Sequence, residues 1–107
     1  MKNKWYLVVH TEETYERNNY KEDFEYTKRY ELAEGLELYL PGQREKSYIR
    51  SVTEAEGGIR AVLVRPVEYA TELSSDTPLD LYYSDYRESC GDGIDETYRV
   101  HITIEQS

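Results

Sequence analysis

The stretch from Ser47 to Val67 constrains the fold more than any other part of the chain. Two runs rich in β-branched residues flank the tripeptide Glu56-Gly57-Gly58. Because glycine readily adopts the positive φ angles that a tight hairpin loop requires, this composition predicts a β-hairpin. The second run, from Ile59 to Val67, is apolar on both faces at its centre, which is typical of a strand covered on both sides. We expect the other strands to pack around it.

The charged residues predict the register of this hairpin. A two-residue turn made of the two glycines would place Arg50 opposite Arg65, and like charges directly opposite each other destabilise a strand pair. A three-residue loop that also includes Glu56 places Glu54 opposite Arg60 instead. We therefore expect the three-residue loop, with one glycine in the left-handed conformation.

Other parts of the chain alternate between apolar and polar residues with a period of two, which predicts further strands. Residues 97–105 show the clearest alternation, with apolar side chains at the even positions from Tyr98 to Ile104. Weaker strand-like runs occupy residues 5–10, 24–32, 36–40 and 79–83. We expect the polar residues 11–21 to form a surface loop or a single helical turn, and residues 68–78 to form a loop.

Together these runs predict an all-β domain, a small antiparallel barrel or sandwich of six to seven strands built on a meander. The alternative is an α+β domain in which residues 12–33 form a helix over the sheet. A chain of 107 residues is long enough for one such domain, which we expect to span residues 1–107.

The cellular location is predicted from the cysteine content and the N-terminal residues. The single cysteine, Cys90, allows no internal disulfide, which is consistent with a reducing compartment. The apolar run from Trp5 to Val9 is too short for the core of a signal peptide or for a membrane span. We therefore expect a cytoplasmic protein that does not bind membranes.

The net charge of −9 is concentrated in one segment of the chain. Residues 68–96 contain nine acidic residues and one basic residue, Arg87. Nucleic acids and anionic membranes attract the opposite charge, so direct binding to either is disfavoured. The same segment contains Tyr82, Tyr83 and Tyr86. Since neighbouring residues of a strand point to opposite faces, Tyr82 and Tyr83 cannot both be buried on the same side.

No motif in the chain predicts catalysis, a metal site or a cofactor. Cys90 is the only thiol, and no sequence signature joins it to His10 or His101, so we expect it to be inert. The acidic run Asp92–Glu96 does not have the ligand spacing of a calcium-binding loop. The chain also lacks a glycine-rich phosphate loop and the Cys/His spacing of a zinc site.

Crowded carboxylates repel one another, so a segment that retains them is expected to serve something outside the domain. The favoured hypothesis is a non-enzymatic interaction protein whose acidic, tyrosine-bearing surface docks on a basic partner protein. The residues expected to contact this partner are Asp76, Asp80, Tyr82, Asp85, Tyr86, Glu88, Asp92, Asp95 and Glu96.

A specific version of this hypothesis is nucleic-acid mimicry. The partner is then a nucleic-acid-binding enzyme, and the carboxylates occupy the phosphate positions of its groove and inhibit it. Three alternatives remain open from the residues alone. The charge serves only solubility, the domain is a β-barrel module that binds a sugar or peptide on exposed tyrosines, or it is a small enzyme with a carboxylate-based site.

Overall fold

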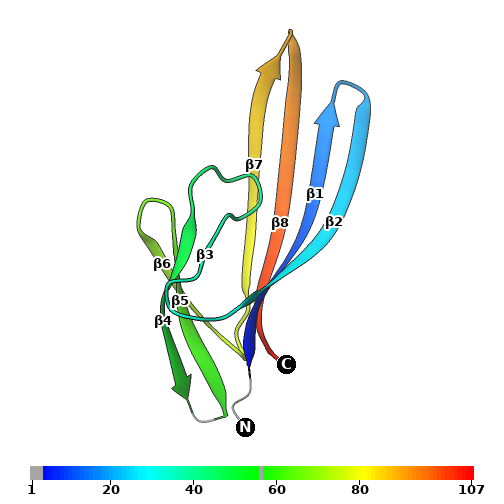
Figure 1. Cartoon of the computed structure of the whole chain (residues 1–107). Coiled ribbons are helices and arrows are strands. Elements are labelled where there is room, and N and C mark those ends of the chain that lie inside the picture. Colours follow the sequence, from blue (N-terminus) through cyan, green and yellow to red (C-terminus); the bar gives the residue numbers. More distant parts are fainter. Residues whose placement is uncertain (1–3, 56) are drawn as a thin grey trace.

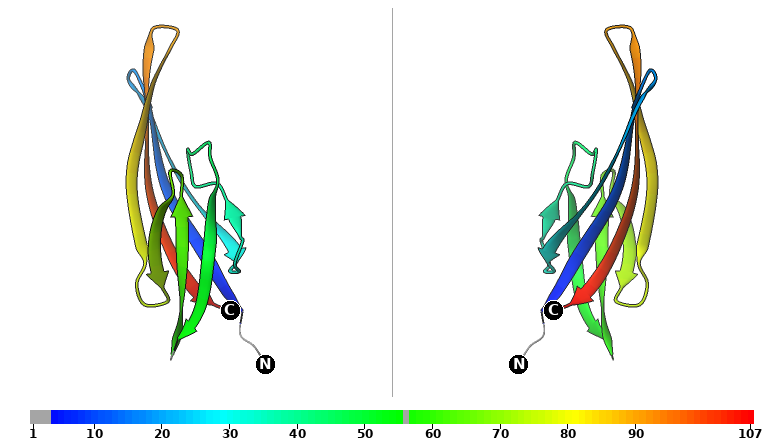
Figure 2. Two further views of the ribbon diagram at one scale, coloured as in Figure 1. Left: turned by 90° about the vertical axis from the view of Figure 1, so that its left-hand side faces the viewer. Right: turned by 90° about the vertical axis from the view of Figure 1, so that its right-hand side faces the viewer.

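The computed structural model, which describes residues 4–55 and 57–107, consists of eight antiparallel strands in two four-stranded sheets (Figure 1). The sheets face each other as a sandwich and do not close into a barrel (Figure 2). The predicted all-β class is therefore confirmed, with eight strands in place of the six or seven expected. The described residues contain no helix, so the alternative prediction of a helix over residues 12–33 is wrong. The described part of the chain accordingly has no helix that could cross a membrane.

The larger sheet, which we call the long sheet, has the strand order β2-β1-β8-β7. Its strands are β1 (Trp5–Arg17), β2 (Tyr20–Glu31), β7 (Leu79–Ser89) and β8 (Asp92–Gln106). The two hairpins β1–β2 and β7–β8 are joined by pairing of β1 with β8, which runs from Trp5 opposite Gln106 to Arg17 opposite Ile94. The first and last strands of the chain are thus neighbours at the centre of this sheet.

The smaller sheet, the short sheet, is a meander of four consecutive strands. They are β3 (Glu37–Leu38), β4 (Ser47–Ala55), β5 (Gly58–Arg65) and β6 (Tyr69–Ser74). Strand β5 lies between β4 and β6, which confirms the interior position predicted from its apolar faces. The meander is therefore real, although it accounts for only one of the two sheets.

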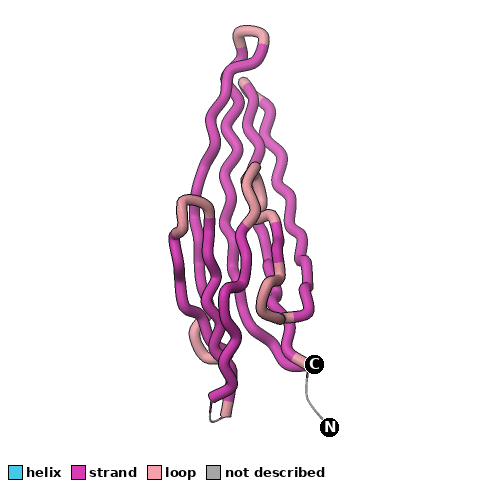
Figure 3. Tube along the Cα trace, turned by 60° about the vertical axis from the view of Figure 1, so that its left-hand side comes forward, coloured by secondary structure: helices cyan, strands magenta, loops and turns pink. Residues whose placement is uncertain are grey.

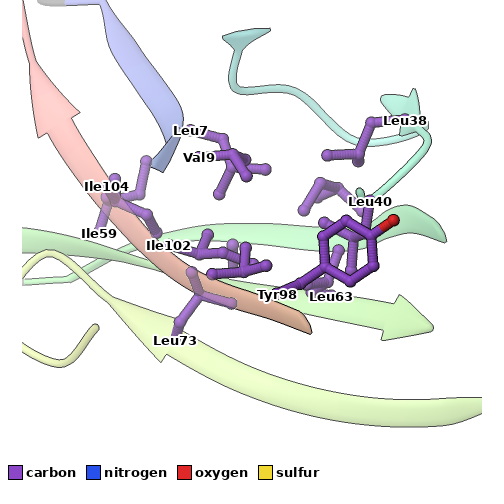
Figure 4. Close-up of a cluster of buried hydrophobic side chains, with 13 residues drawn as sticks. Leu7, Val9, Leu38, Leu40, Ile59, Leu63, Leu73, Tyr98, Ile102 and Ile104 are labelled. Atoms are coloured by element: carbon purple, nitrogen blue, oxygen red, sulfur yellow. The ribbon is translucent and has the colours of Figure 1, made fainter. Parts of the chain in front are cut away.

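The core lies between the facing surfaces of the two sheets (Figure 4). On β8 the even positions point inward, as the alternation predicted, and Ile102 is completely buried. On β1 the odd positions point inward, and Leu7 is completely buried. The cluster of buried side chains comprises Leu7, Val9, Leu38, Leu40, Ile49, Ile59, Ala61, Leu63, Leu73, Tyr98, Val100, Ile102 and Ile104.

The long sheet extends far beyond the short sheet, which covers only one end of it (Figures 2 and 3). Its strands have 11 to 15 residues, whereas a typical strand has about five or six. The molecule measures 56 × 26 × 18 Å, and its radius of gyration of 16.0 Å exceeds the ~13 Å of a compact chain of this length. We call the overhanging part of the long sheet the arms, defined as residues 12–25 and 82–98.

The predictions for two connecting segments are wrong. Residues 11–21 form neither a loop nor a helical turn, because β1 continues to Arg17 and the hairpin turns at Asn18-Asn19. Residues 68–78 include strand β6. By contrast, the predicted strand at residues 36–40 is reduced to the two residues of β3. Residues 12–17 of β1 do not alternate between apolar and polar side chains, because this part of the strand lies outside the core. The sequence pattern therefore did not predict that they form a strand.

The predicted register of the β4–β5 hairpin is also wrong. Ala55 pairs with Gly58 and Thr53 pairs with Arg60, so Glu54 does not lie opposite Arg60. Glu56, which belongs to the predicted three-residue loop, lies outside the described residues. Gly57 has a φ of 78°, in the left-handed region that glycine tolerates.

The pairing of Ala55 with Gly58 already separates the two arginines that a glycine-only turn would have placed together, because the same register continued along β4 would put Arg50 opposite Leu63. A register shift between Ile49 and Ser51 then leaves Arg50 without a partner in register on β5. Arg65 lies opposite Tyr69 of β6 and stacks 4.5 Å above its ring. The chain thus avoids the like-charge pair through the register set by Ala55 and Gly58, and the bulge in β4 is an additional irregularity.

Candidate functional site: the acidic arms

The arms carry nearly all of the excess negative charge of the protein. Residues 12–25 and 82–98 contain eleven acidic and three basic residues, which accounts for eight of the nine net negative charges. Along the sequence, the excess charge falls in residues 68–96. The fold adds the β1–β2 arm, because β1 pairs with β8 along its whole length.

Two arginines form ion pairs with three of the arm carboxylates. Arg17 donates to Asp92 at 2.9 Å, and Asn18 donates to the same carboxylate at 3.2 Å. These hydrogen bonds lower the pKa of Asp92. Arg87 lies 2.5 Å from Glu96 and 3.9 Å from Asp85. The first contact joins β1 to β8 at the tip of the arms, the end where the two hairpin turns lie. The second joins β7 to β8 on the inner face, the face of the long sheet on the side of the short sheet.

Glu96 is also held by a tyrosine. The hydroxyl of Tyr98 donates to Glu96 at 2.5 Å, and this bond, aided by Arg87, lowers the pKa of the carboxyl group. Burial and the adjacent carboxylate raise the pKa of Tyr98, so its hydroxyl remains a donor at neutral pH. The ring of Tyr98 lies 5.3 Å from that of Tyr83, whose hydroxyl donates to the carbonyl of Pro41. This tyrosine pair marks the end of the covered part of the long sheet.

The other eight arm carboxylates have no lysine or arginine nitrogen within 4.0 Å among the described residues. They are Glu12, Glu13, Glu16, Glu22, Asp23, Glu25, Glu88 and Asp95.

Neutral hydroxyl groups bind four of these eight carboxylates. Tyr20 donates to Glu22 at 2.6 Å, and Thr14 donates to Asp23 at 2.9 Å. The longer contacts are Tyr26 to Glu13 at 3.2 Å and Tyr86 to Glu88 at 3.4 Å. Hydroxyl dipoles stabilise a carboxylate but leave its charge in place, so the arms stay strongly negative.

Two pairs of these carboxylates lie directly opposite each other on the face of the long sheet that points away from the short sheet, which we call the outer face. Glu12 pairs in register with Glu25, and Glu16 pairs with Asp95. Like charges opposite each other destabilise a strand pair. Each of these two pairs is therefore repulsive, although Lys21 lies opposite Glu16 on its other side.

Exposed aromatic rings accompany the charge. Tyr82 is 68% exposed and Tyr86 is 60% exposed, both on the outer face of β7. Arg99 stacks 5.4 Å above the ring of Tyr82. Tyr83 points to the inner face, which confirms that Tyr82 and Tyr83 lie on opposite sides. Tyr20 and Phe24 add exposed rings on β2.

The nine residues expected to contact a partner are distributed over several surfaces. The outer face holds five of them, namely Asp80, Tyr82, Tyr86, Glu88 and Asp95. Asp85 and Glu96 point to the inner face, and Asp92 lies at the tip. Asp76 lies in the turn before β7, at the opposite end of the strand from the tip. The fold therefore brings five of the nine together, and four lie elsewhere.

Sequence reasoning missed the carboxylates of β1 and β2 that share the outer face. Glu12 and Glu16 have the same parity as Val8 and His10, so a strand continued past His10 would have placed them on one face. Nothing in the sequence shows that Glu25 faces Glu12, because that pairing depends on the register of the β1–β2 hairpin.

The other chemical candidates do not assemble into a site. Cys90 lies in the turn at the tip, about ten residues along β8 from His101, which corresponds to roughly 30 Å. A cysteine–histidine pair with His101 is therefore excluded. Asp95 and Glu96 point to opposite faces of β8, so the acidic run Asp92–Glu96 does not converge on one cation.

One mixed group of potential metal ligands does lie together. Ligand atoms of His10, Glu12 and Glu25 are all within 4.8 Å of one another on the outer face.

Comparisons with protein-family models, curated proteins and solved structures gave no significant match.

Proposed function

We propose that the acidic arms are a docking surface for a basic region of a partner protein. The observation that carries this proposal is the set of eight arm carboxylates with no lysine or arginine within 4.0 Å among the described residues. A basic partner would supply the missing counter-charges. Long-range attraction of this kind accelerates encounter and selects partners of the opposite charge.

The length of the arms supports the same conclusion. Most of the inner face of the arms lies beyond the short sheet, and Ile94 and Tyr98 are the buried hydrophobic side chains among the described arm residues, so lengthening these strands adds little buried apolar area while it adds like-charge repulsion. A fold selected for stability alone would end its strands near the edge of the core. The exposed rings of Tyr82 and Tyr86 offer contact area that a partner can desolvate, which is how tyrosines contribute to interfaces.

A protein surface that binds nucleic acid is the basic region that fits best, because it already presents a row of cations for a polyanion. The arms would then occupy the place of the phosphates. In this version of the proposal nucleic acid and the arms compete for the same groove, so added nucleic acid would displace the arms. If the basic region has another role, added nucleic acid would not change the binding of the arms.

The test compares two triple variants with equal changes in net charge. The arm variant carries Glu16→Lys, Glu88→Lys and Asp95→Lys on the outer face. The control variant carries Glu34→Lys, Glu45→Lys and Glu72→Lys, three exposed positions outside the arms. Thermal melting of each variant verifies that it is folded.

Immobilised wild-type protein and the control variant should capture the same basic protein at low salt and release it as the salt approaches about 0.5 M. The arm variant should lose this capture. Added double-stranded DNA then reports whether the captured surface is a nucleic-acid groove. Equal capture by the arm variant and the wild type would refute docking through the arms.

A further inference from the structure

A row of four polar side chains crosses the outer face of the long sheet at the base of the arms. His10 of β1 lies directly opposite His101 of β8, while Thr27 of β2 and Asp80 of β7 complete the row. Both histidines use their Nδ1 atom within this row. His10 Nδ1 is 2.7 Å from Thr27 Oγ1, and His101 Nδ1 contacts the carboxylate of Asp80.

These contacts orient the two imidazole rings differently. The contact with Thr27 leaves Nε2 of His10 directed at Glu25, whose Oε1 is 3.0 Å away. Asp80, in contrast, draws His101 toward β7 and away from this group. A histidine that binds a metal through one nitrogen commonly has its other nitrogen fixed by a neighbouring polar group, as Thr27 fixes that of His10.

Glu12 completes the group around His10. One ligand atom from each of His10, Glu12 and Glu25 lies within 4.8 Å of the others. Glu12 and Glu25 face each other in register across β1 and β2, so their like charges are unfavourable unless a cation lies between them. Arg99 is opposite Glu12 on the other side, but its guanidinium stacks on Tyr82.

The ligand types and spacing identify the class of cation. An imidazole nitrogen with two carboxylates favours zinc or a similar first-row divalent ion over calcium and magnesium, which prefer all-oxygen sites. Ligands bound to zinc at about 2.0 Å in a tetrahedron are about 3.3 Å apart. Small side-chain rotations would bring the three atoms from within 4.8 Å to that spacing.

A fourth coordination position would be open to solvent. His10 and Glu12 line a hollow of about 410 Å³ on the outer face, bounded on its other side by Tyr82 and Asp80. Three protein ligands and an open fourth position are the arrangement of zinc sites that bind water or an external ligand. We propose that His10, Glu12 and Glu25 form a Zn²⁺ site that joins β1 to β2 at the base of the arms.

The test is Zn²⁺ titration of the wild type and four single variants by calorimetry, with Co²⁺ absorption as a probe of tetrahedral geometry. His10→Ala and Glu25→Gln should each weaken Zn²⁺ binding at least tenfold. Two controls are matched to them. His101→Ala removes the neighbouring exposed histidine, and Glu16→Gln removes an arm carboxylate with the same change in charge as Glu25→Gln. Both should bind Zn²⁺ within threefold of the wild type.

Melting curves recorded without metal establish that each variant is folded, and Zn²⁺ should raise the melting temperature of the wild type and the two controls only. Absence of saturable binding by the wild type would overturn the proposal. So would equal losses in His10→Ala and His101→Ala, or in Glu25→Gln and Glu16→Gln, because binding would then reflect general negative charge. The outcome is independent of docking by the arms.

Discussion

The repulsion between Glu16 and Asp95 gives a quantitative test of how charge affects the arms. The two residues are directly opposite in register on β1 and β8, a geometry that places their Cβ atoms about 5.5 Å apart. With that separation in water, two unit charges repel by about 0.6 kcal/mol at 0.01 M salt and by about 0.1 kcal/mol at 1 M. A double-mutant cycle built from Glu16→Gln and Asp95→Asn isolates this term.

We expect the cycle to show a destabilising coupling of about 0.6 kcal/mol at low salt that nearly disappears at 1 M. Asp95→Asn alone should raise the melting temperature by about 2–5 °C at low salt. Urea unfolding at the two salt concentrations measures the coupling. A coupling of zero at low salt, or one that does not change with salt, would refute the inference that these carboxylates repel each other in the folded protein.

Two further predictions concern the β7–β8 hairpin. The pKa of Glu96 lies below its ordinary value of 4.5 because of Tyr98 and Arg87, so the stabilising effect of this carboxylate is present above pH 4.5 and is lost as pH falls through its folded-state pKa. The difference in unfolding free energy between wild type and Glu96→Gln, measured by urea unfolding, should therefore shrink below pH 4.5. A difference that grew at lower pH would contradict this prediction. Cys90 has a φ of 53° beside Gly91 with a φ of 83°, the geometry of a turn that favours Asn-Gly. Replacing Cys90 by Asn should therefore stabilise the protein by about 1 kcal/mol, whereas Cys90→Val, which is β-branched, should destabilise it.

The parts of the fold that were predictable from the sequence are those in contact with the core. Strand β8 was recognised because residues such as Ile102 alternate with polar ones, and that alternation exists because one face packs on the short sheet. Strand β5 was recognised because it is interior to its own sheet. In both cases burial imposes a pattern on the sequence that can be read without a structure.

The arms were not predictable for the same physical reason. Beyond Thr11, strand β1 leaves the core, so its outward-facing residues, such as Glu12 and Glu16, alternate with inward-facing ones that are also polar, such as Glu13. Without an apolar face the period of two is invisible, and the segment resembles a loop. Only pairing with β8 on one side and β2 on the other reveals that it is a strand.

The candidate site was predicted only in part because it depends on register between distant segments. The acidity of residues 68–96 was evident, but the position of Glu12 beside Glu25, or of Glu16 beside Asp95, requires that β1 lie between β2 and β8. The arrangement around His10 has the same origin, since its neighbours Thr27 and Glu25 come from another strand.

Salt should raise the stability of the free protein and weaken its docking to a partner, because the same carboxylates are responsible for both effects. Salt screens the repulsion between Glu16 and Asp95, which should make the arms more stable. Salt also screens attraction to a basic partner, which should weaken docking. Asp95→Asn should likewise stabilise the free protein while it weakens partner capture. Charge that served only solubility would show the first effect without the second, so measuring both on one variant separates docking from solubility.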